Sequence, residues 1–189
     1  MTRRIVILTG SELRHSFVRT ALAAAPGVEV ARTWCEGVEN TLVDLVAAPD
    51  VSAEEKAHIA ARGRSEEDFF GAFVAGHVMI GNVVREPLLS AFPGRFLNVH
   101  LGLSPYYRGT GTNFWPLVNG EPEYVGATFM HIDAGVDTGE VIHQIRARVF
   151  PGDSPHQVGN RLIADMVSAY ADIVRNFDRL ERLPQIPVP

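Results

Sequence analysis

The chain has 189 residues, of which 46% are hydrophobic, 21% charged and 8% aromatic, and its formal net charge is −5. This composition is typical of an ordinary globular protein and excludes a disordered, collagen-like or membrane-spanning chain. The negative charge argues against a nucleic-acid-binding surface. The single cysteine, Cys35, excludes an internal disulfide. The only lysine, Lys56, does not lie in a G-x-x-x-x-G-K-[ST] motif, so the chain has no P-loop.

The N-terminal segments predict a strand, a helix and a second strand in succession. Residues 3–9 form a short, β-branched apolar run typical of a buried strand, residues 12–25 predict a helix, and residues 28–34 predict a second strand. This order is typical of a parallel sheet covered by helices. Residues 36–72 are polar and helical in pattern and contain no convincing third strand, so one strand of the expected sheet is unaccounted for.

Short strands and helices alternate through the rest of the chain. We expect strands at residues 76–84, 95–100, 124–132 and 140–149, and short helices at residues 86–92 and 112–118. Ser154 and Gln157 form a capping-box pair that begins the last helix, whose apolar positions recur every three or four residues from Val158 to Phe177.

These elements predict an α/β fold with helices on both faces of a mostly parallel sheet. We expect one domain over residues 1–183 and a frayed, proline-rich tail over residues 184–189. No apolar run reaches the roughly 18 residues of a membrane helix, so we expect a soluble, cytoplasmic protein with neither a membrane nor a nucleic-acid partner. No sequence pattern identifies an oligomer interface, so the sequence does not decide between a monomer and a homodimer.

The first candidate site lies on the predicted strand 95–100. Asn98 and His100 are two residues apart, so on a strand their side chains point to the same face. They also lie near the carboxyl end of the strand, where open α/β sheets bind ligands. A buried histidine hydrogen-bonded to an asparagine for purely structural reasons explains the pattern equally well.

The second candidate site is the loop over residues 133–139. Asp133 and Asp137 supply two carboxylates, and Gly135 and Gly139 allow the backbone to approach a ligand closely. By itself this loop is more typical of a capped hairpin. Together with the asparagine and histidine, however, an aspartate predicts acyl transfer: the amide stabilises an oxyanion, the imidazole moves a proton, and the carboxylate orients the imidazole. The chain has no G-x-S-x-G nucleophile motif, which favours direct transfer to an amine.

Three segments resemble the folate-dependent formyltransferases, which include the glycinamide ribonucleotide, methionyl-tRNA and sugar N-formyltransferases. They are Leu97-Asn-Val-His100, Ser104-Pro-Tyr-Tyr-Arg-Gly109, and Gly126-Ala-Thr128 through Gly139. The resemblance implies a single Rossmann-like domain of formyltransferase type, the cosubstrate 10-formyltetrahydrofolate, and catalysis by Asn98, His100 and Asp137.

The resemblance also implies where the cosubstrate binds. The pterin would lie between the end of the strand 76–84 and the loop 133–138. The implied contacts are Met79, Ile80, Gly81, Asn82, Val83, Val84, Asp133, Ala134, Gly135, Val136 and Asp137. No metal is implied, and His131 and His143, on adjacent predicted strands, lack a third ligand nearby.

The acceptor is expected to be a small-molecule amine. Only Gly10 and Ser11 resemble the glycine-rich phosphate cradle of the purine enzyme, and Glu12 would repel a phosphate, which disfavours glycinamide ribonucleotide. The charge, and the absence of the extra C-terminal domain of the tRNA enzyme, disfavour initiator tRNA. The remaining candidates for the acceptor are an aminosugar nucleotide and a natural-product precursor.

Seven residues are expected near this acceptor: Gly10, Ser11, Arg14, His15, Tyr106, Tyr107 and Arg108. A solvated helix face explains the charged members somewhat better than acceptor binding does, and simple loop packing does the same for the aromatic ones. The alternative functions are a formyltetrahydrofolate hydrolase, with water as the acceptor, and a ligand-binding relative without turnover.

Overall fold

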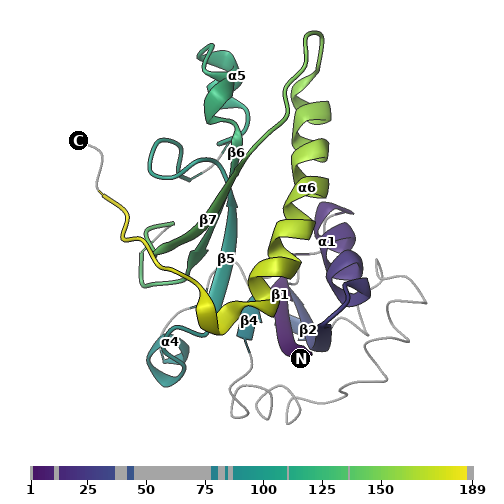
Figure 1. The fold of residues 1–189 in the computed structure, drawn as a ribbon, viewed down its shortest axis with the longest axis vertical. Coiled ribbons are helices and arrows are strands. Elements are labelled where there is room, and N and C mark those ends of the chain that lie inside the picture. The colour runs from purple at the N-terminus through teal and green to yellow at the C-terminus, as the bar shows by residue number, and fades with distance from the viewer. Residues whose placement is uncertain are drawn as a thin grey trace.

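A mixed sheet of seven described strands forms the centre of the computed structural model (Figure 1). The structure describes residues 2–10, 13–36, 42–44, 78–80, 84, 87–109, 111–135 and 137–186. The strands are β1 (Arg3–Thr9), β2 (Val28–Glu36), β3 (Leu42–Asp44), β4 (Val78–Ile80), β5 (Phe96–Leu101), β6 (Gly126–His131) and β7 (Val141–Arg146). Their order across the sheet is β3-β2-β1-β4-β5-β6-β7.

The centre of the sheet is parallel, and its two sides are antiparallel. Strand β1 runs parallel to both β2 and β4, and β4 runs parallel to β5. Strand β3 on one side, and β6 and β7 on the other, run antiparallel to their neighbours. The predicted Rossmann-like α/β fold is confirmed.

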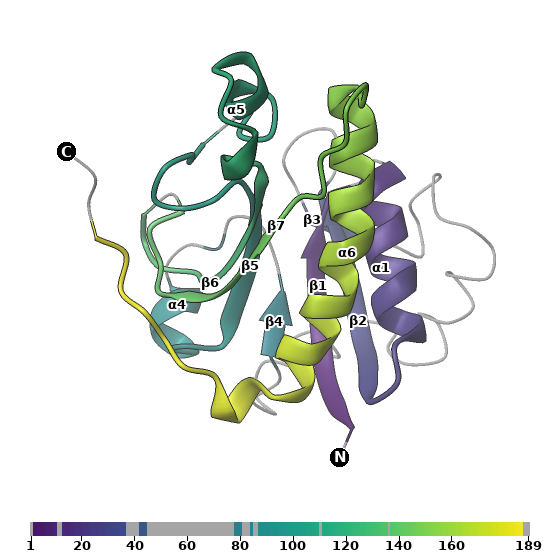
Figure 2. The ribbon, with the colours of Figure 1, turned by 45° about the horizontal axis from the view of Figure 1, so that its top comes forward.

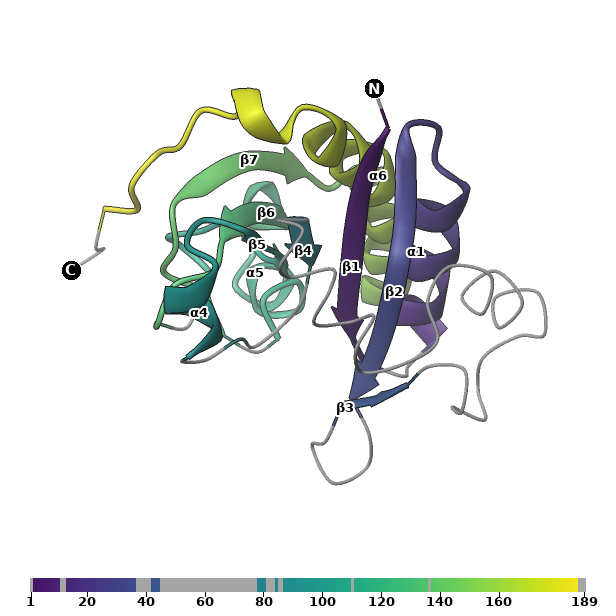
Figure 3. The ribbon, with the colours of Figure 1, turned by 90° about the horizontal axis from the view of Figure 1, so that it is seen from below.

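Helices cover both faces of this sheet. They are α1 (Leu13–Ala24), α4 (Leu88–Ala91), α5 (Trp115–Val118) and α6 (Pro155–Arg175), with the 3-10 turns η2 (Pro122–Tyr124) and η3 (Phe177–Arg179). Helices α1 and α6 lie side by side along β1 and β2 (Figures 2 and 3). On the opposite face, Leu88 and Leu89 of α4 pack against the apolar core. Among the described helices, none combines the length and the apolar character needed to cross a membrane.

Strand β1 is buried on both faces, which explains its unbroken aliphatic run. Ile5 and Ile7 pack with Leu22 of α1 in the core beneath α1 and α6. Val6 and Leu8 belong to the second core, beneath α4. Burying an aliphatic side chain of this kind stabilises the fold by about 1.5–3 kcal/mol relative to leaving it exposed.

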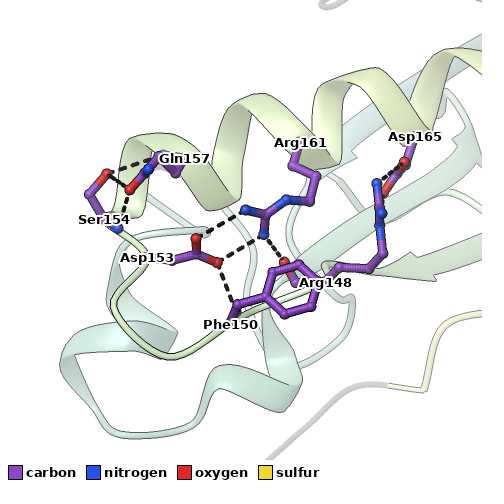
Figure 4. A network of polar contacts seen from close by, with 7 residues as sticks. All are labelled: Arg148, Phe150, Asp153, Ser154, Gln157, Arg161 and Asp165. Atoms are coloured by element: carbon purple, nitrogen blue, oxygen red, sulfur yellow. Dashed lines mark hydrogen bonds and ion pairs between the residues drawn. The ribbon is translucent and has the colours of Figure 1, made fainter.

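Helix α6 begins as the sequence predicts, at a capping box (Figure 4). The Ser154 hydroxyl accepts a hydrogen bond from the Gln157 backbone N–H, and the Gln157 side chain accepts one from the Ser154 backbone N–H at 2.8 Å. Two turns into the helix, the Arg161 guanidinium pairs with both carboxylate oxygens of Asp153 at 2.8 and 3.0 Å and lies over the Phe150 ring. These contacts hold the segment that precedes α6 against the first two turns of the helix. The helix ends at Arg175, so the predicted position Phe177 lies in η3 instead.

One strand of the sheet was missed by the sequence analysis. Leu42–Asp44 form β3 within the segment 36–72, where no strand was expected. A strand of three residues is too short to show the alternation on which a sequence prediction depends. The helices expected elsewhere in that segment lie outside the described residues.

The chain around the start of the predicted tail contacts β7, through Leu183, and the loop after β6, through Gln185. Leu183 exchanges two backbone hydrogen bonds with Val141, at 2.8 and 2.9 Å. The Gln185 side chain donates to the backbone carbonyls of Asp137 and Gly139 at 2.9 and 2.7 Å. The tail therefore packs against the loop that the sequence analysis singled out. Residues 187–189 lie outside the described part.

Candidate active site

The three side chains expected to be catalytic meet at the carboxyl end of β5. His100 Nδ1 lies 3.1 Å from one carboxylate oxygen of Asp137, and Asn98 Nδ2 lies 3.4 Å from the other. Strand β5 brings Asn98 and His100 to one face, and the loop between β6 and β7 brings Asp137 to them. His100 is buried, with 8% of its surface exposed. The predicted juxtaposition is thus present in the structure.

Both ring nitrogens of His100 face hydrogen-bond acceptors. Nδ1 faces the Asp137 carboxylate, and Nε2 lies 3.2 Å from the backbone carbonyl oxygen of Tyr107. A neutral imidazole can donate only one hydrogen bond, whereas the imidazolium donates two. The carboxylate and the carbonyl therefore hold the ring from both sides and fix its orientation, which leaves an imidazole placed to move a proton within the site.

A polar network holds the loop after β5, which carries the Tyr107 carbonyl. Thr128, opposite His100 on β6, donates from its hydroxyl to the Gly102 carbonyl at 2.7 Å and accepts from the Ser104 backbone N–H at 2.9 Å. Gln144 of β7 donates to the Ser104 carbonyl at 2.7 Å and to the Thr128 hydroxyl at 3.0 Å. Sequence reasoning assigned no role to Thr128 or Gln144, because their contacts become visible only once the strands are in register.

The loop that carries Asp137 is fixed by its own contacts. Asp137 has a positive φ of 53°, which is uncommon for a residue other than glycine. Asp133 accepts hydrogen bonds from the Gly135 backbone N–H at 3.0 Å and from the Thr138 hydroxyl at 2.7 Å. At Gly139, a Cβ would lie 1.8 Å from the His131 carbonyl oxygen, so only glycine allows this approach. Asp133 therefore shapes the loop that presents Asp137.

A cavity of about 890 Å³ surrounds these groups. Asn98, His100 and Asp137 all line it. Of the residues expected to bind the cosubstrate, Val84, Asp133, Ala134, Gly135 and Asp137 line the cavity. Met79 and Ile80 lie in β4. Gly81, Asn82, Val83 and Val136 lie outside the described residues.

The residues expected at the acceptor are only partly brought together. Arg14 and His15, at the start of α1, line the cavity. Gly10 is covered by His15, since a Cβ there would lie 2.7 Å from the imidazole Nδ1, and its carbonyl accepts a hydrogen bond from Arg19 at 2.8 Å. Ser11 lies outside the described part.

Tyr106, Tyr107 and Arg108 are absent from the described lining of the cavity. The Tyr106 ring packs on Tyr124 of η2, with the ring centroids 4.8 Å apart. The Tyr107 hydroxyl donates to the Glu121 carboxylate and accepts from Asn119. The aromatic pair thus packs on η2, and a role for these side chains at the acceptor stays a prediction. Tyr107 contributes through its backbone carbonyl.

His131 is a further residue of the cavity wall, at the end of β6. Burial lowers its pKa, and the charge of Arg182 lowers it further. Because its pKa lies below the ordinary 6.5, this imidazole is neutral at pH 7. Its ring lies against Phe177, whereas His143 lies against Phe129. The described residues contain no group of three or more His, Cys, Asp or Glu able to hold a metal ion.

Comparisons with known proteins found a matching family and similar structures. The family model described as Formyl transferase matches residues 52–174. The methionyl-tRNA formyltransferase of Desulforamulus reducens is 31% identical over 110 residues, which cover 58% of this chain and 34% of the relative. The chain spans about a third of the length of the curated relatives it matches.

Solved structures share the fold. Glycinamide ribonucleotide transformylase 1 from Symbiobacterium toebii superposes with a TM-score of 0.66 and 23% identity, over 96% of this chain and 94% of that one. The formyltransferase PseJ from Anoxybacillus kamchatkensis was solved with UDP-4,6-dideoxy-4-formamido-L-AltNAc and tetrahydrofolate. It superposes with a TM-score of 0.61 and 19% identity, over 97% of this chain and 82% of that one. At these identities the likeness concerns the fold.

Proposed function

Since this chain belongs to the formyl transferase family, we propose that it transfers the formyl group of 10-formyltetrahydrofolate to the amine of a small-molecule acceptor. The observation that carries the proposal is the contact of Asn98 and His100 with the Asp137 carboxylate inside one cavity. Neither a serine nor a cysteine lines the described part of that cavity. Direct attack by the amine is therefore favoured over a covalent intermediate on the protein.

Asn98 and His100 stabilise the tetrahedral intermediate. The amine nitrogen attacks the formyl carbon, and the carbonyl oxygen takes up the negative charge. The Asn98 amide carries two N–H groups, so one can donate to this oxygen while the other faces Asp137. When protonated, His100 would place a positive charge beside the same oxygen. A single donor of this kind is worth a factor of roughly 10²–10³ in rate.

A proton must then pass from the amine to the departing folate nitrogen. The new C–N bond leaves a positive charge on the attacking amine, and cleavage of the old C–N bond leaves the folate nitrogen in need of a proton. We assign this transfer to His100, or to a water molecule held by Asp137. The contact between His100 Nδ1 and Asp137 keeps the imidazole oriented throughout the cycle.

The cavity walls support separate places for the two substrates. Val84, Leu89 and Ile132 give an apolar wall on the α4 face, next to the loop that carries Asp137, which suits a flat pterin. Arg14 and His15 line the part beside α1 and suit an acceptor with an anionic group. The sugar nucleotide and tetrahydrofolate bound to the related PseJ support an aminosugar nucleotide as one candidate. A natural-product precursor is the other.

The conversion of 10-formyltetrahydrofolate to tetrahydrofolate, followed by absorbance with and without a panel of amines, tests the proposal. We expect amine-dependent conversion that falls roughly 10²–10³-fold in Asn98→Ala and in His100→Ala. His143→Ala removes an exposed imidazole outside the described lining of the cavity and is the matched control, expected to keep full activity.

Three other outcomes are informative. Conversion without any amine would identify a hydrolase that uses the same residues. Normal transfer by His100→Ala would contradict the assignment of the catalytic residues. The absence of both conversion and folate binding by calorimetry would overturn the proposed function.

A further inference from the structure

The cavity has a second, apolar arm between α1, α6 and β5. Val18 and Leu22 line it from α1, Val99 from β5, and Ile163 and Met166 from α6. On β5, Val99 alternates with Asn98 and His100, so it points to the opposite face of the sheet. The arm therefore lies beneath α1 and α6, whereas the catalytic side chains lie on the α4 face.

The arm is continuous with the catalytic site because the cavity crosses the carboxyl edge of the sheet. The described part of β4 ends at Ile80, which pairs with Ile7 of β1 and Leu97 of β5. His100, on the α4 face, and Tyr170, beneath the other face, line one and the same cavity.

Two buried polar side chains also line this part of the cavity: Arg19 of α1, whose guanidinium donates to the Gly10 carbonyl at 2.8 Å, and Tyr170 of α6. The Tyr170 side chain is 1% exposed and lines the cavity, and its ring stands edge-on against Phe129 at 5.5 Å. Within the described structure the Tyr170 hydroxyl has no hydrogen-bond partner. A buried hydroxyl without a partner costs free energy that a suitably placed ligand oxygen would recover. Burial also raises the pKa of Tyr170, so the hydroxyl stays a neutral donor.

We infer that this arm is a specificity pocket for an apolar substituent of the acceptor, and that the Tyr170 hydroxyl donates a hydrogen bond to an oxygen of that substituent. The inference rests on the proposed function and refines it, because it names an amine with an aliphatic or aromatic chain that carries a carbonyl or ether oxygen. This chemistry fits a natural-product precursor better than an aminosugar nucleotide, whose substituents are mostly polar.

The test uses two probe amines of equal length, an n-alkylamine and a monoacetylated α,ω-diaminoalkane, whose binding to the full chain is measured by calorimetry. Wild-type protein is expected to bind both, with affinity rising about threefold to fourfold for each added methylene until the arm is filled. Tyr170→Phe is expected to lower the affinity for the acetylated probe about tenfold and to leave the affinity for the alkylamine unchanged. Because it removes a buried hydroxyl without a partner, Tyr170→Phe is also expected to raise the Tm of the ligand-free protein.

Ile163→Trp, a half-buried position on α6, is expected to fill the arm and abolish the gain with chain length. Val118→Trp on the exposed α5 is the matched control and should bind both probes normally. Equal binding of both probes to Tyr170→Phe and wild type, or no effect of Ile163→Trp, would overturn the inference.

The same measurements separate this inference from the proposed function. If the probes bind the arm as expected but no amine releases tetrahydrofolate, the proposed function fails and the pocket stands. If formyl transfer proceeds with other amines while neither probe binds, the pocket fails and the proposed function stands.

Discussion

The close packing around His100 leaves no room for a side chain on Gly102. A Cβ at this position would lie 2.8 Å from His100 Nε2 and 2.6 Å from the Tyr107 carbonyl oxygen. The imidazole and the carbonyl that faces it would both have to move. Since displacement of a catalytic group by about 1 Å can cost roughly 100-fold in rate, the glycine sets the position of the imidazole.

Gly102→Ala is therefore expected to lower kcat/KM about 100-fold without loss of the fold, as measured by the folate assay and by circular dichroism. Gly120→Ala is the control, because Gly120 also has a positive φ, of 75°, but a Cβ there meets nothing within 4 Å. Equal activity of the two variants would show that the contact at His100 has no catalytic importance.

Gln185 acts on the opposite side of the site, through the backbone of the Asp137 loop. Its amide donates to the carbonyls of Asp137 and Gly139, and so supports the left-handed conformation of Asp137. Gln185→Glu replaces this donor by an oxygen facing two carbonyls. We expect it to lower kcat more than Gln185→Ala does, with about tenfold lost in the alanine variant.

The KM for the amine should stay near the wild-type value in both Gln185 variants, because Gln185 is absent from the described cavity lining and acts on the orientation of Asp137. A rise in KM at constant kcat would instead assign Gln185 to acceptor binding.

At the start of α6, the pair between Asp153 and Arg161 makes stability depend on pH. Hydrogen bonds from Arg161 and from the Phe150 backbone N–H hold the pKa of Asp153 at about 2, below its ordinary value of 3.8. Because the folded-state pKa is lowered, the stabilisation is complete above the ordinary value and is lost as the pH falls towards 2.

Asp153→Asn should therefore lower the free energy of unfolding in urea at pH 6, and the difference from wild type should shrink as the pH falls from about 4 to about 2. Asp165→Asn, which breaks the more exposed pair with Arg148, is the comparison and should have the smaller effect. A difference that is constant over this pH range would assign the effect to packing rather than to charge.

Among the elements, those with strong local signals could be predicted from the sequence. The aliphatic run of β1 predicts a buried strand, and the capping box of α6 predicts where that helix begins. Strand β3 could not be predicted, because three residues at a sheet edge carry too little pattern. The predicted strand 140–149 ends early, since β7 pairs with β6 only as far as Arg146.

The site was predictable where it depends on side-chain chemistry and spacing, as for Asn98 and His100. It was not predictable where it depends on backbone atoms or tertiary packing. The contribution of Tyr107 is a carbonyl oxygen, which has no signature in the sequence. Tyr170 belongs to the apolar stripe of α6 and has the pattern of an ordinary core residue. Only the cavity beside it distinguishes a ligand-binding residue from a residue that merely packs the core.

At the scale of the molecule, ligand binding should raise thermal stability. A ligand that binds the folded state stabilises it by about 2.7 kcal/mol at one hundred times its Kd. We expect tetrahydrofolate to raise the Tm of wild type and, equally, of Ile163→Trp, because that substitution fills only the arm beneath α6. No change in the Tm of wild type at saturating tetrahydrofolate would contradict binding on the α4 face.

The cavity is lined by residues from both faces of one sheet. If each substrate occupies its own face, neither has to leave before the other enters. A ternary complex can then assemble in either order, and initial rates at several fixed amine concentrations would give double-reciprocal lines that intersect. Parallel lines would mean that the formyl group rests on the protein between two half-reactions. The shape of the cavity therefore predicts the kinetic mechanism, in which both substrates are bound before the formyl group moves.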